Sequence, residues 1–278
     1  MLSGKTTLIA HIGYPTASFK APMIYNPWFE GKGIDAMVVP MGVKPEDYAD
    51  SLKAIFRMSN VHGALVTMPH KVTTVGLVDE LSTTAKIAGA CNAILKRPDG
   101  SLLGDMFDGT GFVRGLKRNG FVCQGAKCLL AGAGGVGSAI AASLAAEGVA
   151  AISVFKTKSQ SAENLVSRLQ QYYPQIDTHL VHSTDVAGFD LIVNGSPLGM
   201  KDDDPLPFDL TNLAPKTFVG EVVMKSEMTP LLEIAKARGC RYVIGTAMLF
   251  EMIPAYLEFF GFGSATPDEL RAVQKIQY

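Results

Sequence analysis

A glycine-rich turn is the first feature of this chain that predicts chemistry. It reads Gly132-Ala133-Gly134-Gly135-Val136-Gly137 and lies between a short apolar run, 127–131, and an alanine-rich run, 138–147. Glycine between a strand and a helix lets the backbone approach a pyrophosphate, which the free N–H groups at the helix start then bind. Residues 132–136 are therefore predicted to bind a dinucleotide. The alternative is a tight glycine turn that holds no ligand.

The end of the next strand indicates which dinucleotide is bound. A β-rich run, 151–155, leads into Phe155-Lys156-Thr157-Lys158-Ser159. An acidic residue in this place usually binds the ribose 2′-hydroxyl of NAD, and here no carboxylate would repel a 2′-phosphate. Phe155, Lys156 and Thr157 are therefore predicted cofactor residues, and NADP is favoured over NAD. The alternative for the two lysines is a solvated strand end.

A lysine and an aspartate lie in two further short motifs. Lys71 closes Val66-Thr67-Met68-Pro69-His70-Lys71, and Asp108 lies in Gly104-Asp105-Met106-Phe107-Asp108-Gly109. Hydride leaves a carbinol carbon only if the hydroxyl proton is removed as the carbonyl forms, and a lysine held by a carboxylate can take that proton. An isolated pair of this kind would more often be a surface ion pair, so the neighbouring motifs decide between the two interpretations.

In order and spacing, these motifs resemble those of the shikimate dehydrogenase family, which carries V-T-x-P-x-K and G-D-N-T-D-G-x-G. The resemblance extends over about residues 13–261. Four more segments are similar to family motifs: Gly89-Ala90-Cys91-Asn92, Asn194-Gly195-Ser196-Pro197-Leu198-Gly199-Met200, Thr229-Pro230-Leu231-Leu232 and Met248-Leu249. Several spaced motifs in a fixed order are far more specific than any one of them.

The resemblance implies a catalytic role for two residues and a binding role for two more. Lys71 would exchange the proton of the substrate hydroxyl, and Asp108 would orient Lys71 and bind a second hydroxyl. Thr67 and Asn92 would line the same pocket.

The resemblance also implies positions near the nicotinamide and the substrate ring. Ser196, Val222 and Gly245 would lie at the nicotinamide. Met224 and Met252 fall where the family has a substrate-binding tyrosine and glutamine, and Glu221 stands in place of an aspartate.

The N-terminal substrate motif departs from the family pattern. The family has H-S-x-S-P, with two serines that bind the substrate carboxylate, whereas this chain has Ser18-Phe19-Lys20-Ala21-Pro22. A polar substrate group left without its partner costs about 1–3 kcal/mol, so the change is expected to alter substrate preference. Ser18, Phe19 and Lys20 are predicted to bind substrate, with Ser18 or Lys20 replacing the serines. Alternatively, Phe19 only packs inside its domain.

Alternating β-rich and helical runs predict the elements that hold these motifs. Runs 6–12, 34–43 and 64–68 predict strands, and 45–58 predicts an amphipathic helix. After residue 108, the order strand, glycine turn, helix, strand predicts a Rossmann unit. The expected fold is α/β with two domains separated by a cleft. These are an N-terminal α/β substrate domain, 1–107, which the resemblance completes with C-terminal helices 246–278, and a Rossmann-type NAD(P)-binding domain, 108–245.

Composition excludes several classes of protein. The chain has 278 residues, 47% hydrophobic and 18% charged, and a formal net charge of −1, which favours a folded protein and neither nucleic acid nor an anionic membrane as partner. Its four cysteines form no C-x-x-C pair, which predicts reduced thiols in the cytoplasm. Glycines interrupt the charge-free run 128–146, so no membrane span is expected. The five histidines show no zinc pattern, so no metal is expected.

The combined expectation is an NADP-dependent enzyme of the shikimate pathway of aromatic amino acid biosynthesis. It would reversibly oxidise a ring hydroxyl of shikimate, quinate or a related cyclic hydroxy acid, and it would be a monomer or homodimer. One alternative is a family member that has diverged to another hydroxy or keto substrate, with little shikimate activity. Another is a nucleotide-binding regulator without turnover, which the retained Lys71 and Asp108 disfavour.

Overall fold

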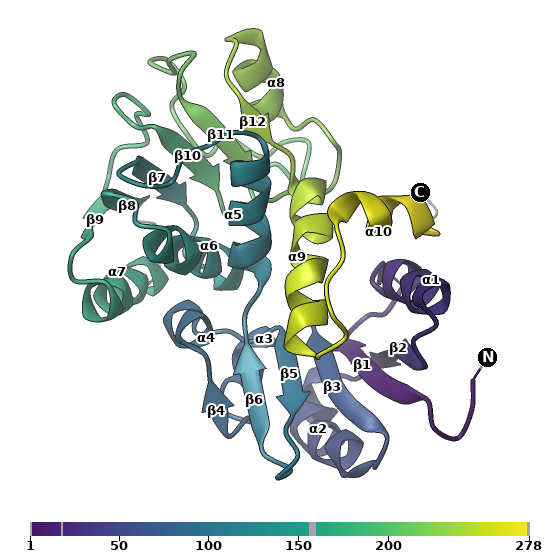
Figure 1. Cartoon of the computed structure of the whole chain (residues 1–278). Helices are drawn as coiled ribbons and strands as arrows, with labels where there is room; N and C mark the ends of the chain where they lie inside the picture. Colours follow the sequence, from purple (N-terminus) through teal and green to yellow (C-terminus); the bar gives the residue numbers. More distant parts are fainter. Residues whose placement is uncertain (1, 18, 156–159, 277–278) are drawn as a thin grey trace. The chain divides into compact units, whose positions relative to one another are not determined.

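The computed structural model describes residues 2–17, 19–155 and 160–276 (Figure 1). The chain divides into two compact units, residues 1–107 with 253–278 and residues 108–252. Each unit contains a six-stranded sheet, so the expected α/β class is confirmed. Residues 246–252, expected in the first domain, belong to the second unit, because helix α9 (Gly245–Phe259) crosses the boundary.

The first unit is built on a mixed sheet with the strand order β2-β1-β3-β5-β6-β4. Its strands are β1 (Thr7–Gly13), β2 (Ala36–Gly42), β3 (Val61–Val66), β4 (Glu80–Leu81), β5 (Ala93–Lys96) and β6 (Leu102–Asp105). Its helices are α1 (Pro22–Lys32), η1 (Pro45–Asp47), α2 (Tyr48–Arg57), α3 (Lys71–Thr74), α4 (Thr83–Ala88) and α10 (Pro267–Val273). Strand β5 is antiparallel to both β3 and β6, so the sheet is less uniformly parallel than the sequence indicates.

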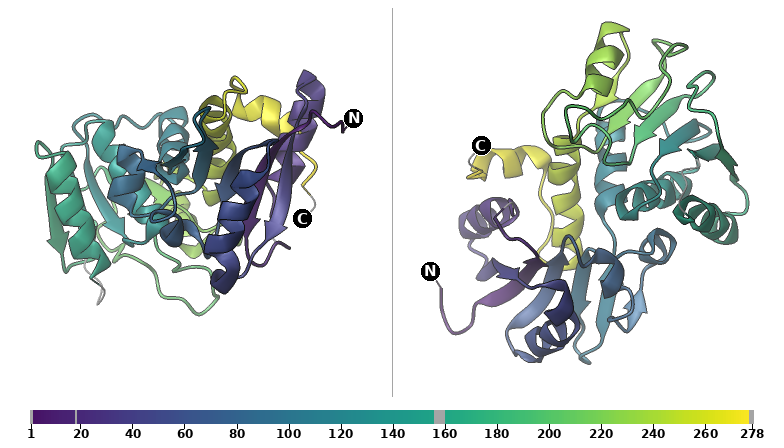
Figure 2. Two further views of the ribbon diagram at one scale, coloured as in Figure 1. Left: turned by 90° about the horizontal axis from the view of Figure 1, so that it is seen from below. Right: turned by 180° about the vertical axis from the view of Figure 1, so that it is seen from behind.

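Two helical layers cover the faces of this sheet. Helix α2 places Leu52, Ile55 and Phe56 against Ala10 and Ile12 of β1 on one face. Phe260, the residue after α9, packs on β3, where a Cβ added to Gly63 would lie 2.5 Å from its ring. Helix α10 lies beside α1 (Figures 1 and 2).

Strand β2 forms one edge of the first sheet, and its outer side is occupied. The side chain of Asn26 in α1 donates to the carbonyl of Val38 at 3.1 Å and accepts from the Val38 N–H at 2.8 Å. Pro40, two residues further along the strand, has no N–H group.

The second unit has a fully parallel sheet with the order β12-β11-β10-β7-β8-β9. Its strands are β7 (Lys127–Ala131), β8 (Ala151–Phe155), β9 (Asp177–Val181), β10 (Leu191–Asn194), β11 (Phe218–Glu221) and β12 (Tyr242–Val243). In chain order this is the 3-2-1-4-5-6 arrangement of a Rossmann fold.

Helices cover both faces of the second sheet. They are α5 (Asp108–Arg118), α6 (Gly135–Ala146), α7 (Ser161–Tyr172) and α8 (Pro230–Ala237). Helix α8 packs Leu231, Leu232 and Ala235 on one face, and Phe112 of α5 lies against Gly220 of β11 on the other. Within the described residues, no helix is long and apolar enough to cross a membrane.

Candidate functional site

The glycine turn after β7 is shaped by backbone contacts. Gly132 has φ of +98°, and an added Cβ there would lie 2.6 Å from the backbone of Gly195. A Cβ on Gly137 would lie 2.1 Å from the carbonyl oxygen of Gly132. At Gly134, by contrast, a Cβ would meet nothing within 4 Å, and the residue is exposed. Gly132 and Gly137 therefore permit close packing of the backbone, and Gly134 leaves open space beside it.

Helix α6 begins directly at this open position. Gly134 is its N-cap and provides no side-chain cap, and the Ser138 N–H bonds the Gly134 carbonyl at 2.8 Å. The N–H groups of the first turn of a helix lack partners within the helix and attract anions. Ala133, Gly135 and Val136 are half-buried around this turn. The arrangement suits a pyrophosphate.

The turn lies where the strand order of the second sheet reverses. From β7 the chain proceeds outward to β8 and β9, then returns to β10 on the other side of β7. The ends of β7 and β10 are paired, with Ala131 opposite Asn194 and a 2.8 Å bond from the Gly195 N–H to the Ala131 carbonyl. Ligands of open α/β sheets bind at such a reversal point.

A buried carboxylate organises the loops that follow β10 and β11. Glu221 Oε1 accepts from Asn194 Nδ2 at 2.9 Å and from the Val222 and Val223 N–H groups at 2.8 and 3.0 Å. Glu221 Oε2 accepts from the Thr229 hydroxyl at 2.9 Å. Burial raises the pKa of Glu221, and these hydrogen bonds oppose the rise.

The same network fixes Ser196, one of the predicted nicotinamide residues. Asn194 Oδ1 accepts from the Ser196 hydroxyl at 2.6 Å, and Asn194 Nδ2 donates to the Leu198 carbonyl at 2.8 Å. The sequence did not mark Glu221 as an organiser of this loop, because its partners lie 27 and 8 residues away. The sequence feature that could have indicated this role is a carboxylate at the end of a buried strand.

The remaining predicted cofactor residues follow β11, begin α9 or lie at the end of β8 and just beyond it. Val222 is half-buried beside Glu221, and a Cβ on Gly245 would lie 2.3 Å from the Val223 carbonyl oxygen. Phe155 is half-buried at the end of β8. Lys156 and Thr157 lie outside the described residues.

In the first unit, the predicted substrate residues gather where several strands begin or end. Lys71 is half-buried at the start of α3, and its carbonyl accepts from the Cys91 N–H at 2.8 Å. The next residue, Asn92, is buried, and its carbonyl accepts from the Val66 N–H at 2.8 Å. The Thr67 N–H bonds the Ile12 carbonyl at 2.9 Å. Thr67, Lys71 and Asn92 are thus held by one set of backbone bonds.

The predicted aspartate begins the second unit. Asp108 is the first residue of α5 and is buried, and the residue before it, Phe107, donates its N–H to Asn92 Oδ1 at 2.9 Å. Its neighbour Gly109 permits α5 to approach α6, since a Cβ there would lie 2.0 Å from the Ala139 carbonyl oxygen. Lys71 and Asp108 therefore belong to different units, and their pairing stays a prediction.

Phe19 occupies the loop where the family has its first serine. Its ring stacks on His11 with centroids 4.0 Å apart, and its Cζ would lie 2.9 Å from a Cβ on Gly13. The same Cβ would lie 2.4 Å from Cγ2 of Thr67, so the ring lies near a predicted substrate residue. Lys20 is half-buried, and Ser18 lies outside the described residues.

The two predicted methionines differ in their surroundings. Met224 is 41% exposed after β11. Met252 is half-buried in α9, and its Cβ would lie 2.6 Å from a Cβ on Gly111, so it packs closely on α5.

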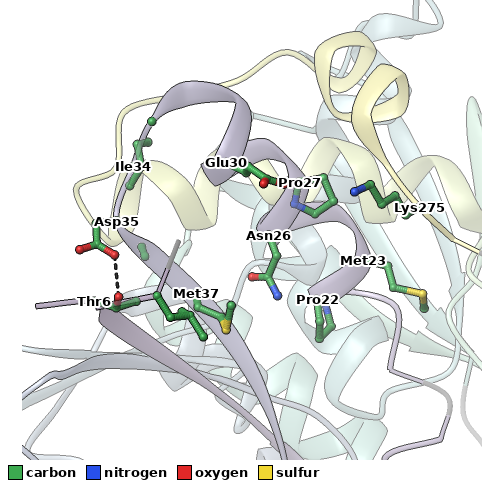
Figure 3. Close-up of a pocket in the computed structure, with 13 residues that line it drawn as sticks. Thr6, Pro22, Met23, Asn26, Pro27, Glu30, Ile34, Asp35, Met37 and Lys275 are labelled. Atoms are coloured by element: carbon green, nitrogen blue, oxygen red, sulfur yellow. Dashed lines mark hydrogen bonds between the residues drawn. The ribbon is translucent and has the colours of Figure 1, made fainter. Parts of the chain in front are cut away.

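A groove of about 700 Å³ lies elsewhere, along α1 and β2 (Figure 3). Its wall includes Met23, Met37 and Lys275, and it contains none of the predicted site residues. The carboxylate of Asp35 at its rim accepts from the Thr6 hydroxyl at 2.6 Å. Among the described residues, no three His, Cys, Asp or Glu side chains cluster as metal ligands.

Comparison with known proteins agrees with these motifs. The family model of the shikimate dehydrogenase substrate binding domain matches residues 11–94. A shikimate dehydrogenase (NADP(+)) of Acidiphilium cryptum is 34% identical over 98% of both chains. The crystal structure of shikimate 5-dehydrogenase from Listeria monocytogenes, in complex with shikimate and NAD, is 29% identical with a TM-score of 0.90, covering 98% of this chain and 97% of that one. The 5-ketofructose reductase of Gluconobacter sp. strain CHM43 is 25% identical with a TM-score of 0.88, covering 98% of both. The chain belongs to the shikimate dehydrogenase family.

Proposed function

We propose that this chain is an NADP-dependent oxidoreductase that reversibly oxidises a ring hydroxyl of shikimate or of a related cyclic hydroxy acid. The single observation that carries the proposal is Lys71, retained in its family motif and held beside Thr67 and Asn92 by the backbone bonds to Cys91 and Val66. Relatives named shikimate dehydrogenase (NADP(+)) match almost the whole chain.

The second unit would bind the nucleotide. The open side of Gly134 and the N–H groups at the start of α6 fit a pyrophosphate. Ser196, held by Asn194, and Gly245, packed on Val223, would hold the nicotinamide ring. When bound, NADP supplies the acceptor for the hydride that leaves the substrate carbon.

Lys71 would manage the proton. As the C–H bond of the carbinol breaks, its hydroxyl proton passes to the Lys71 amine, and the carbonyl forms. In the reverse direction the ammonium returns that proton to the carbonyl oxygen. Asp108 would orient Lys71 and bind a neighbouring hydroxyl. The bond from Phe107, which precedes Asp108, to Asn92 supports this assignment.

Kinetics with Lys71→Met test the proposal. We expect reduction of NADP by shikimate or quinate to fall about 10³-fold in kcat, because a positioned general base contributes 10²–10⁴-fold. Binding of NADPH, followed by fluorescence, stays unchanged. The control Lys86→Met removes an exposed lysine of the same unit and keeps full activity. A Lys71→Met enzyme within tenfold of wild type refutes the role, and NADPH binding without turnover of any substrate by wild type indicates a regulator.

A second candidate is an uncharged polyhydroxylated substrate. Burial lowers the pKa of His11 to about 4, so at neutral pH the stacked pair of His11 and Phe19 offers a carboxylate neither a charge nor the hydroxyls of the family's serines. His11 Nδ1 is buried and has no hydrogen-bond partner among the described residues, so a neutral hydroxyl would satisfy this nitrogen where a bound ligand reaches it. The similar 5-ketofructose reductase is named for an uncharged sugar.

The two candidates make opposite predictions for Lys20. If the substrate is an acid and Lys20 replaces the serines, Lys20→Ala raises the KM for shikimate. If the substrate is neutral, kcat/KM for 5-ketofructose with NADPH exceeds kcat/KM for shikimate with NADP. Lys20→Ala then leaves kcat/KM for 5-ketofructose unchanged. We further propose that the protein is cytoplasmic and that it is a monomer or a homodimer. Light scattering of the purified protein distinguishes the monomer from the homodimer.

A further inference from the structure

Lys71 stands on a helix too short to be stable by itself. Helix α3 contains four residues, Lys71–Thr74. Helices much shorter than about 12 residues do not persist in water without tertiary support. Some neighbouring group must therefore fix the backbone from which the Lys71 side chain extends.

The residue before Lys71 is held on two sides. The ring of His70 stacks on that of Tyr48 in α2, with centroids 3.9 Å apart and an angle of 8° between the planes. His70 Nε2 donates to the Val43 carbonyl at 2.8 Å, and since a carbonyl only accepts, the proton lies on Nε2. His70 is 1% exposed, so the ring has no freedom to turn.

A second tie runs from Tyr48 through Thr74 to the same histidine. The Thr74 hydroxyl donates to the His70 carbonyl at 2.9 Å, and the Thr74 N–H bonds that carbonyl at 3.0 Å. The Tyr48 hydroxyl lies 2.6 Å from Thr74 Oγ1. Because the threonine proton is already engaged, Tyr48 is the donor in this bond. Burial raises the pKa of Tyr48, which keeps its hydroxyl protonated.

Tyr48 and Thr74 are both fully buried, so neither hydroxyl can exchange its partner for water. The chain of bonds from Tyr48 to Thr74 to His70 spans the whole of α3, from the residue before it to its last residue. Linked hydrogen bonds of this kind strengthen one another in a buried setting.

We infer that Tyr48 and Thr74 are positioning residues that set the place of the Lys71 ammonium group through His70 and the single turn of α3. The inference rests on the proposed function only in assigning proton transfer to Lys71. A shift of about 1 Å in a catalytic group can lower turnover by roughly 100-fold, so a loosened turn is expected to reduce kcat.

Three substitutions with a matched control test the inference by kinetics. Tyr48→Phe and Thr74→Val each remove one hydroxyl of the chain while keeping its volume, and Thr74→Ser keeps the hydroxyl. Tyr25→Phe is the control, because the buried Tyr25 hydroxyl has no hydrogen-bond partner among the described residues. With shikimate and NADP, we expect roughly tenfold to 100-fold lower kcat for Tyr48→Phe and Thr74→Val. The KM for NADP stays constant, and Thr74→Ser and Tyr25→Phe behave as wild type.

Amide hydrogen exchange of the full-length protein gives a readout that needs no substrate. We expect the peptide that covers residues 70–75 to exchange at least tenfold faster in Tyr48→Phe and Thr74→Val, and peptides of the second sheet to be unchanged. Equal exchange in Tyr48→Phe and wild type overturns the inference, as does a kcat loss in Tyr25→Phe as large as that in Tyr48→Phe.

The Lys71→Met enzyme separates the two possible failures. If Lys71→Met abolishes turnover while Tyr48→Phe leaves kcat unaltered, the proposed function stands and the positioning role fails. If Lys71→Met keeps its activity, or wild type turns over no substrate, the proposed function fails, and exchange in residues 70–75 alone decides whether the turn is held by Tyr48 and Thr74.

Discussion

The loops that follow the first strand of each unit are fixed in different ways. After β7, backbone atoms of Gly132, Gly137 and Gly195 approach so closely that a side chain on any of them would collide. After β1, the loop is filled by the side chain of Phe19, stacked on His11. A loop shaped by close backbone contacts tolerates no other residue than glycine at those positions. A loop filled by side chains can accept other residues, and so bind another ligand, without a shift of the strands.

Substitution within the glycine turn is expected to have the largest effect. In Gly132→Ala the Cβ meets the Gly195 backbone at 2.6 Å in a left-handed conformation, which should cost about 3 kcal/mol or more of unfolding free energy. In Gly134→Ala the Cβ enters open space, so the midpoint of denaturation stays constant while the Kd for NADPH rises roughly tenfold. Calorimetry and fluorescence titration check both. Equal destabilisation by the two substitutions would contradict the division of roles between these glycines.

Restoring the serines tests the first loop. The double substitution Phe19→Ser with Ala21→Ser supplies two hydroxyls, each worth about 1 kcal/mol to a carboxylate, so kcat/KM for shikimate should rise roughly tenfold to 100-fold. Activity with an uncharged substrate such as 5-ketofructose should not rise. Steady-state kinetics with both substrates measure the change, and a gain of equal size for both would show that relief of packing, and not carboxylate binding, is responsible.

The pH dependence of stability gives the smallest effect. His11 has its pKa lowered by burial to about 4, against 6.5 when unfolded. Below pH 6.5 the unfolded chain gains a proton that the folded chain does not, so stability that is present at pH 7 is lost as the pH falls toward 4. Between pH 7 and 5 the wild type should lose about 1–2 kcal/mol more than His11→Leu in urea unfolding.

The exposed His182 provides the control for this comparison. His182→Gln should follow the pH dependence of wild type. If His11→Leu loses as much stability as wild type between the same two pH values, the buried imidazole does not titrate as its surroundings indicate.

Elements with a strong local pattern could be predicted from the sequence. Strands β7 and β8 begin and end at the expected residues, 127–131 and 151–155. The expected helix at 45–58 begins as a 3₁₀ turn, η1, before α2. The short elements α3, β4 and α4 were not predicted, because each is held by contacts outside itself. An example is β4, which is held by pairing with β6, where Glu80 lies opposite Leu103.

The candidate site likewise contains features that a local sequence pattern indicates and features that depend on residues distant in the sequence. The glycine turn and the Lys71 motif are contiguous in sequence and could be recognised there. The network around Glu221 joins Asn194 and Thr229, and the support of Lys71 joins Tyr48 and Thr74. These hydrogen-bond partners are brought together by the fold and leave no local pattern in the sequence, so they could be identified only in the structure.

The outer side of β2 restricts how copies of the protein could associate. An exposed strand edge invites another chain to extend the sheet, and proteins commonly block such edges. Here the Asn26 amide takes both free groups of Val38, and Pro40 has no hydrogen to donate. A continuous intermolecular sheet through β2 is therefore disfavoured, which protects this edge of the first sheet against amyloid-like stacking.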